Sequence, residues 1–330
     1  MTTTDWRTSL ATDAALRRFT DVRELLPDVN NPSPLVRLNQ IPPAERLDIY
    51  LKLEWLNPFG SVKDRTAAYL LAGLAERGEL NGREVVEASS GNTAIALAAL
   101  VSLAGTKLTT TIPDGVPEEK KIILRMLGAE VWETPDDLCP VDHPQDGAIA
   151  LARSLAASEG GTRFAHTDQY ENQDNVKAHY ETTGPEIWRQ TEGRVRWFIA
   201  GYGTAGTISG VGRYLKEQDS LVQIVGVEPE PGHRLPGLKS LKEATAPGIF
   251  DQEVIDQAIV VSDDDAYRTT KAIWRREALM VGPSTGAVVH AATQIDAEPD
   301  DVVVAISADS GIKYTSYFEE ILGDEGKPTV

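Results

Sequence analysis

Cysteine and basic residues are scarce in this chain of 330 residues. The single cysteine, Cys139, excludes a disulfide framework and a cysteine-based zinc site, as is typical of proteins from a reducing compartment. The 32 lysine and arginine residues face 50 aspartate and glutamate residues, so the formal net charge is −18. Because an acidic surface repels nucleic acid and anionic lipid, we expect neither as a partner. We also expect no metal, since no zinc motif can be built from one cysteine. The acidity favours solubility, and adaptation to high salt is an alternative explanation.

Long apolar runs are also missing. The longest, 94–104, is interrupted by Ser102 and is too short to cross a bilayer. Residues 1–6 are polar and lack the pattern of a secretory signal peptide, so we expect a cytoplasmic protein with no membrane contact. With 41% hydrophobic residues the chain can bury a sizeable core, and its length predicts one large or two ordinary domains.

Short β-branched runs alternate with longer helical patterns along most of the chain. The predicted strands cover residues 48–53, 83–86, 107–112, 130–133, 195–200, 223–227 and 302–307. The predicted helices cover residues 64–76, 93–104, 117–127, 146–157, 207–218, 266–277 and 286–295. This alternation predicts an α/β fold with mostly parallel sheets, in which ligands bind at loops beyond the carboxyl ends of the strands.

One such loop, 201–206, reads Gly-Tyr-Gly-Thr-Ala-Gly. It matches a dinucleotide-binding pattern, and Glu228 ends the next strand where such a fold has its ribose-binding acid, so an NAD-binding dehydrogenase is one interpretation. Any phosphate can bind backbone N–H groups at a helix N-terminus, and the hydroxyls of Thr204 and Thr207 favour a terminal phosphate group. A tight strand-to-helix turn without a ligand is the structural alternative.

A second loop places Lys63 between the strand at 48–53 and the following helix. The N-terminal end of a helix dipole disfavours an ammonium ion, and partial burial disfavours it further. A lysine there should have a lowered pKa, which suits an amine that forms a Schiff base. An ordinary exposed lysine is the alternative.

The segment 57–65, Asn-Pro-Phe-Gly-Ser-Val-Lys-Asp-Arg, resembles the cofactor-lysine segment of cysteine synthases and cystathionine β-synthases. These are pyridoxal phosphate (PLP) enzymes of fold type II, similar to the tryptophan synthase β subunit. The resemblance runs from about residue 31 to residue 316, and further landmarks follow in the order of the family. They are the segments 89–93, 169–172, 182–186, 203–207 and 282–287.

The resemblance implies two three-layer αβα domains with mostly parallel, twisted sheets. Residues 1–30 would form an N-terminal arm, and residues 45–167 a smaller domain that carries the carboxylate loop. Residues 31–44 and 168–330 would form the larger domain that carries the PLP-phosphate loop. The resemblance also implies a homodimer.

The resemblance assigns a role to each candidate site residue. Lys63 would bind PLP as a Schiff base and take the Cα proton, Asn92 would contact the phenolate oxygen, and Ser284 would face the pyridine nitrogen. The phosphate would be bound by Gly203, Thr204, Ala205, Gly206 and Thr207, of which Ala205 stands where many relatives have glycine. The substrate carboxylate would be bound by Ser89, Ser90, Gly91, Thr93 and Gln169.

A neutral serine at the pyridine nitrogen makes PLP a moderate electron sink, which favours elimination at Cβ over transamination. The resemblance therefore implies a cysteine synthase of the EC 2.5.1 class, which replaces the leaving group of an activated serine by a sulfur nucleophile through an aminoacrylate. Cystathionine β-synthase, serine dehydratase and diaminopropionate synthase activities stay open on the same scaffold. A protein without enzymatic activity is a further alternative.

The loop 228–239 bears on the leaving group. It lacks the Gly-Ile-Gly segment of acetylserine enzymes, and its spacing to residues 247–251 resembles O-phosphoserine sulfhydrylases. The resemblance implies that Lys239 meets the substrate phosphate, and Arg234 and His233 offer further positive charge. A solvated basic loop is the alternative, so O-acetylserine stays open, as does the identity of the sulfur donor.

Overall fold

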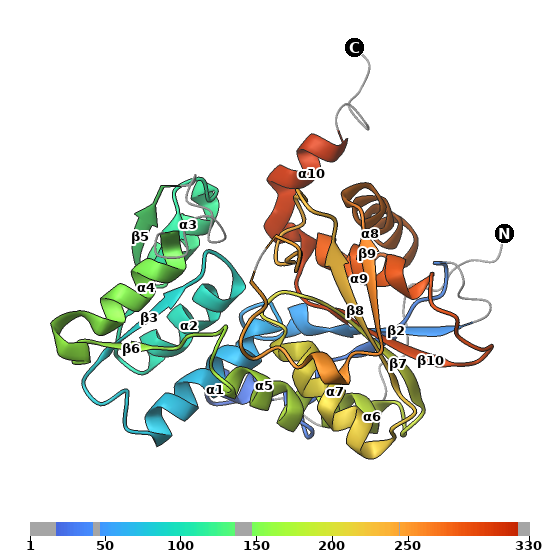
Figure 1. Cartoon of the computed structure of the whole chain (residues 1–330), viewed down its shortest axis with the longest axis horizontal. Coiled ribbons are helices and arrows are strands. Elements are labelled where there is room, and N and C mark those ends of the chain that lie inside the picture. The colour runs from blue at the N-terminus through green and yellow to red at the C-terminus, as the bar shows by residue number, and fades with distance from the viewer. Residues whose placement is uncertain (1–17, 42–46, 136–146, 244, 323–330) are drawn as a thin grey trace, which may run out of the picture.

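The computed structural model describes residues 18–41, 47–135, 147–243 and 245–322. Cys139 and most of the predicted N-terminal arm lie outside these ranges. Two sheets organise the described chain, and in Figure 1 the four-stranded sheet lies at the left and the six-stranded sheet at the right. No helix among the described residues is long and apolar enough to cross a membrane, and these residues contain no cluster suited to a metal ion.

The six-stranded sheet has the strand order β1-β2-β10-β7-β8-β9, and only the edge strand β1 is antiparallel to its neighbour. Its strands are β1 (Leu35–Arg37), β2 (Asp48–Leu53), β7 (Val195–Gly201), β8 (Gln223–Pro229), β9 (Gln257–Val261) and β10 (Val302–Ser307). The four-stranded sheet, of order β5-β4-β3-β6, is parallel throughout. Its strands are β3 (Glu84–Ala88), β4 (Leu108–Pro113), β5 (Glu130–Thr134) and β6 (Phe164–His166).

Helices cover both faces of each sheet. They are α1 (Lys63–Glu76), α2 (Asn92–Leu103), α3 (Glu118–Met126), α4 (Gly147–Ala157), α5 (Asp174–Ala178), α6 (Gly184–Gln190), α7 (Gly206–Gln218), α8 (Asp263–Glu277), α9 (Pro283–Ala292) and α10 (Thr315–Leu322). A π-helical turn, His179–Thr183, joins α5 to α6. Short 3-10 turns at Val22–Leu25, Glu54–Leu56, Ser158–Gly161, Gln252–Val254 and Gly311–Tyr314 complete the described structure.

The alternation of side chains along β10 shows how the larger core is divided. Val303 and Ala305 pack with α8 and α9, whereas Val302 and Val304 pack with α6 and α7 on the opposite face. Successive side chains of a strand point to opposite faces, so a strand covered on both sides reads as a continuous apolar run. In the smaller unit α2 and α4 cover the two faces of β3 in the same way. The predicted α/β fold with two three-layer units is confirmed.

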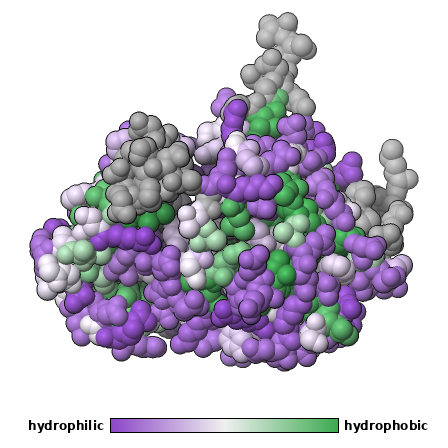
Figure 2. All heavy atoms as spheres, viewed as in Figure 1, coloured by the Kyte–Doolittle hydropathy of each residue, from purple (hydrophilic) through white to green (hydrophobic). Residues whose placement is uncertain are grey.

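The predicted elements all form, and most end within two residues of the predicted bounds. The prediction missed the short strands β1, β6 and β9, and the helices α5, α6 and α10. The predicted boundary at residue 45 assigns β2 to the smaller unit, but β2 is hydrogen-bonded into the six-stranded sheet between β1 and β10. The domain bounds stay a prediction. The pairing of β2 favours its assignment to the larger unit. The surface seen in Figure 2 is mostly hydrophilic, in keeping with the net charge.

Candidate active site

Two adjoining cavities lie where loops from both sheets meet. The inner cavity is lined by the starts of α1 and α9 and by the loop between β7 and α7. Residues 236–238 line both cavities, and the outer cavity adds the loop between β3 and α2 and Lys239. The predicted site residues on these walls are Lys63, Ser89, Ser90, Gly91, Asn92, Thr93, Gln169, Gly203, Thr204, Ala205, Thr207, Lys239 and Ser284. Gly206 is the one predicted residue that is not on either wall.

Lys63 is the first residue of α1 and lies at the carboxyl end of the larger sheet. A hydrogen bond from Val62 N to the carbonyl oxygen of Ala308 (2.8 Å) holds its loop against the residues that follow β10. Burial lowers the pKa of the Lys63 amine to about 8, and the charge of Asp309 opposes that shift. The predicted pKa reduction therefore has burial as its main cause.

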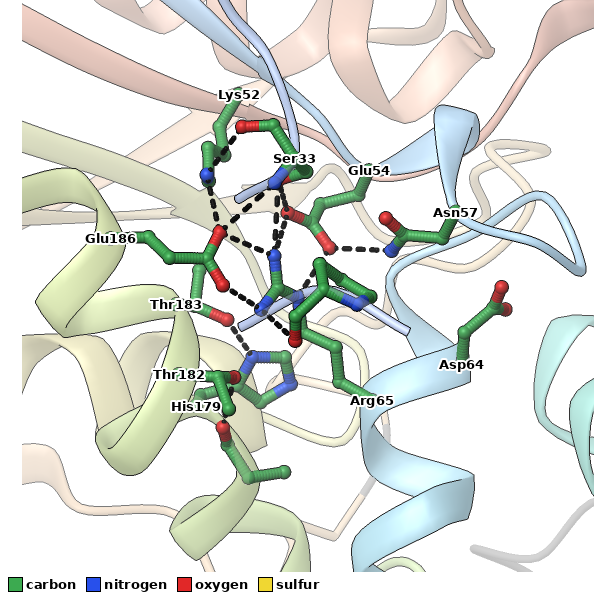
Figure 3. A network of polar contacts seen from close by, with 12 residues as sticks. Ser33, Lys52, Glu54, Asn57, Asp64, Arg65, His179, Thr182, Thr183 and Glu186 are labelled. Carbon is green, nitrogen blue, oxygen red and sulfur yellow. Dashed lines mark hydrogen bonds and ion pairs between the residues drawn. The ribbon is translucent and has the colours of Figure 1, made fainter. Parts of the chain in front are cut away.

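Four buried charges anchor α1 directly after Lys63 (Figure 3). We call Lys52, Glu54, Arg65 and Glu186 the buried charge cluster, and no side chain in it is more than 1% exposed. Arg65 donates to Glu54 Oε2 through Nε (2.8 Å) and to Glu186 Oε2 through Nη2 (2.8 Å). Burial disfavours the charged form of Glu54, but Arg65, Lys52 and Ser33 together outweigh it and lower the pKa of Glu54 to about 2. The two cations and two anions balance, and they tie α1 to β2 and α6.

The segment Gly203–Thr207, which we call the anion cup, joins β7 to α7. Ala205 has a φ of 62°, in the left-handed region, and α7 begins at the next residue. A Cβ atom on Gly203 would lie 2.8 Å from the carbonyl oxygen of Gly237, so only glycine allows this close approach of two backbones. The backbone N–H groups at the start of α7 and the two threonine hydroxyls make this segment a site for an anion.

The loop 89–93, which we call the carboxylate loop, leads from β3 into α2. Ser89 Oγ accepts hydrogen bonds from the N–H groups of Gly91 (3.4 Å) and Ala94 (3.3 Å). Thr93 donates its hydroxyl proton to Gln169 Oε1 (2.7 Å). The loop is thus folded as a helix start, and all five of its residues line the outer cavity.

Gln169 is held by a residue that the sequence interpretation missed. Its Nε2 donates to Glu87 Oε1 and to the carbonyl oxygen of Ala88, both at 3.2 Å. The Gln169 amide must therefore give up one of these bonds before it can donate to a ligand. Glu87 is 1% exposed, and burial raises its pKa to about 7. Glu87 stands just before the carboxylate loop in the sequence, and this position could have identified it as a candidate site residue.

A second missed group lies just after β10. Asn92 Nδ2 donates to Asp309 Oδ2 (2.6 Å), and Tyr314 donates its hydroxyl proton to the same oxygen. Lys313 Nζ donates to Asn92 Oδ1 (2.8 Å) and to the carbonyl oxygen of Gly60 (2.9 Å). Asp309 Oδ1 is buried without a hydrogen-bond partner among the described residues, and Asp309 lines the inner cavity. These residues follow the predicted strand 302–307. The rule that ligands bind at loops beyond strand ends could therefore have identified them from the sequence.

The outer cavity is positively charged although the protein is acidic. Lys63, Lys120 and Lys239 line it, and no carboxylate lines it within the described chain. Lys239 Nζ lies 4.0 Å from the centroid of the Tyr170 ring, and burial lowers the pKa of both Lys120 and Lys239. His233 and Arg234 are not on the described wall of this cavity. The arrangement favours an anionic ligand.

Comparisons with known proteins agree with this geometry. Residues 26–309 match the family model described as "Pyridoxal-phosphate dependent enzyme". This chain belongs to the pyridoxal-phosphate dependent enzyme family. The chain is 41% identical to cysteine synthase B of Salmonella typhimurium over 286 residues, which cover 86% of this chain and 92% of the relative. It is 38% identical to the cysteine synthase of Aquifex aeolicus over 306 residues, which cover 90% of this chain and 92% of the relative.

Solved structures of this enzyme family share the fold. O-ureido-L-serine synthase superposes with a TM-score of 0.84 at 30% identity, covering 94% of this chain and 98% of that chain. The cysteine synthase of Entamoeba histolytica superposes with a TM-score of 0.83 at 26% identity, covering 98% of this chain and 95% of that chain. The family sets aside the NAD-binding dehydrogenase. The acid expected at the ribose is also engaged elsewhere, since Glu228 Oε2 accepts a hydrogen bond from Leu241 N (3.0 Å).

The residues present fit PLP, the cofactor of the family. The inner cavity combines a lysine of lowered pKa, an anion cup and a buried serine at the start of α9, Ser284. The close approach of Gly203 to Gly237 forms a cradle that a Cβ atom would fill. These donors suit a phosphate at one end of the cavity and an aldehyde near Lys63.

Proposed function

We propose that this protein is a PLP-dependent cysteine synthase, which replaces the leaving group on Cβ of an activated serine by a sulfur nucleophile. The observation that carries the proposal is the meeting of Lys63, the anion cup and the carboxylate loop around adjoining cavities. The similarity to cysteine synthases over most of the chain supports it.

When bound, PLP supplies an electron sink that makes the Cα proton of an amino acid acidic. Lys63 would hold the cofactor through its amine and, once released by the substrate, would move the Cα proton. A lysine pKa of about 8 suits this work, because a larger fraction of the amine is neutral near physiological pH than for an ordinary lysine. Ser284 would face the pyridine nitrogen as a neutral hydroxyl. Asn92 would orient the ring, since Nδ2 gives one proton to Asp309 and has a second to donate.

The carboxylate loop would bind the carboxylate of the substrate through its N–H groups and the hydroxyls of Ser90 and Thr93, and Thr93 would first release its proton from Gln169 Oε1. Gln169 would join them by turning its amide away from Glu87. This movement exchanges one carboxylate acceptor for another, so it can take place without leaving the buried amide unpaired.

The direct test measures cysteine formed from sulfide and O-acetylserine or O-phosphoserine by the PLP-loaded chain. We expect sulfide-dependent cysteine formation, and we expect Lys63→Ala to abolish it. Pyruvate as the main product would favour serine dehydratase instead, and rapid use of homocysteine would favour cystathionine β-synthase. Absence of turnover with every serine derivative would contradict the proposal.

For the leaving group we propose phosphate, with Lys239 as the residue that recognises it. Lys239 lies on the wall of an outer cavity that is lined by three lysines and no described carboxylate. A phosphate dianion gains more from such a wall than a neutral acetyl group does. Lys239 and the carboxylate loop line the same cavity, which supports this choice.

The experiment compares kcat/KM for O-phosphoserine and O-acetylserine in Lys239→Ala and in Lys242→Ala. Lys242 lies on the same loop with an exposed side chain, so its variant is the matched control. We expect Lys239→Ala to lower the ratio of phosphoserine to acetylserine activity roughly tenfold or more, as for a lost charged hydrogen bond. An unchanged ratio would refute phosphate recognition by Lys239. The homodimer and the cytoplasmic location stay predictions, and light scattering tests the first.

A further inference from the structure

Two buried side chains stand behind the anion cup, on the side away from the inner cavity. Asn175 of α5 contacts Thr204, and His179 of the π-helical turn contacts Thr207. Both Asn175 and His179 are 0% exposed. Neither lines the described cavity walls, so they can act on a ligand only through the threonines.

The direction of each hydrogen bond around Asn175 can be deduced. Asn175 Nδ2 lies 2.8 Å from the carbonyl oxygen of Gln169, which can only accept, so the orientation of the amide is determined. The same Nδ2 donates to Thr204 Oγ1 (3.0 Å). Asn175 Oδ1 therefore faces Thr66, whose hydroxyl must donate to it (3.0 Å). The single proton of Thr66 is thereby committed.

This assignment determines the tautomer of His179. Its Nε2 lies 3.3 Å from Thr66 Oγ1, which can only accept there because its proton is committed to Asn175. Nε2 consequently carries the proton, and this one N–H is shared between Thr66 Oγ1 and Thr207 Oγ1, which lies 3.2 Å away and also accepts. Nδ1 accepts from Thr183 (2.9 Å), a contact drawn in Figure 3. Burial and the nearby charges of Lys63 and Arg65 lower the pKa of His179 to about 3, so the ring holds this one proton at neutral pH.

Both hydroxyl oxygens of the anion cup thus accept a hydrogen bond from a buried side chain that does not line the cavities. Thr204 accepts from Asn175 and Thr207 accepts from His179, and no hydrogen-bond acceptor for either hydroxyl proton is found among the described residues. We propose that Asn175 and His179 are positioning residues for the PLP phosphate, because they keep both hydroxyl protons of the cup free to be donated. A cup that presents donors only selects the phosphate dianion over the monoanion, whose own proton would find no acceptor. This inference rests on the proposed use of the cup for PLP.

Asn175→Asp tests the first half of this arrangement, because it replaces the Nδ2 donor by an acceptor of the same size. Thr204 would then turn its proton toward Asp, and a negative charge would stand behind the cup. We expect the dissociation constant for PLP to rise roughly tenfold or more. We also expect the ³¹P resonance of the bound phosphate, constant with pH in the wild type, to titrate between about pH 6 and pH 9. Asn81→Asp, which adds the same charge on an exposed loop, is the control.

His179→Gln and His179→Leu test the second half. The glutamine amide can donate to Thr207, whereas leucine cannot, so we expect a displaced ³¹P resonance in His179→Leu and its recovery in His179→Gln. If Asn175→Asp does not fold, this pair decides alone, and equal ³¹P resonances in the two variants overturn the inference. The inference is also overturned if the Asn175 and His179 variants bind PLP within about twofold of the Asn81→Asp control and leave the ³¹P resonance unchanged. A wild-type chain that bound no PLP would overturn the proposed function itself.

Discussion

Replacing Glu186 by glutamine would leave an unbalanced charge inside the protein. Glu186 Oε2 lies 2.6 Å from Lys52 Nζ and 2.8 Å from Arg65 Nη2, and all three side chains are almost completely buried. With Glu186 neutral, the buried charge cluster would hold two cations against the one carboxylate of Glu54. Removing one partner of a buried ion pair costs about 3–5 kcal/mol. Glutamine keeps the size and part of the hydrogen bonding, so we expect about 3 kcal/mol.

Urea unfolding at neutral pH measures this cost, with Glu159→Gln as the control. The Glu159 carboxylate is 62% exposed and lies 3.7 Å from Arg163, so its loss should cost less than about 1 kcal/mol. The control has the same change of charge and size at a solvated site. A cost for Glu186→Gln no greater than that of the control would refute the reasoning.

A double variant separates charge balance from lost contacts. Lys52→Met combined with Glu186→Gln leaves the balanced pair of Arg65 and Glu54. We expect the double variant to be clearly more stable than the sum of the two single effects predicts, by about 1 kcal/mol or more. If the two costs simply add, the charges act independently and the cluster is not a balanced unit.

Three further predictions follow from local geometry. Burial raises the pKa of Glu87 to about 7 from an ordinary value of 4.5, so the wild type should lose stability relative to Glu87→Gln as pH rises from about 4.5 to 7. If the difference in unfolding free energy between the wild type and Glu87→Gln stays constant across that pH range, the prediction is wrong. Ala205→Gly should raise the free energy of unfolding by up to about 1 kcal/mol, because it relieves a φ of 62°. If Ala205→Gly instead lowers the free energy of unfolding measured in urea, strain at Ala205 does not limit the stability of the protein. Gly203→Ala should weaken PLP binding roughly tenfold, because its Cβ atom would meet Gly237 O at 2.8 Å. An unchanged dissociation constant would contradict this.

Local patterns in the sequence were enough to predict most of the regular elements and the loops that line the cavities. β2 and β10 match the predicted ranges. For β10 the reason is that an apolar run marks a strand covered on both faces. β9 was missed because three of its five residues are exposed, as suits the edge of a sheet. Lys63 could be singled out because a lysine at the N-terminal end of a helix, in the loop that follows a strand, is unusual on electrostatic grounds.

The sequence by itself determined the α/β class, the loops that face the cavities and the chemical type of each site residue. Only the tertiary structure decided the partners of these residues. Asn92 meets Asp309 across 217 positions, Lys52 meets Glu186 across 134, and Thr66 meets Asn175 across 109. Buried polar groups must find partners, but the chain does not encode locally which distant group satisfies them. Packing of the strands and helices therefore decides three features of the site. These are the hydrogen bond from Asn92 to Asp309, the charge balance of the buried charge cluster and the direction of the hydrogen bonds to the anion cup.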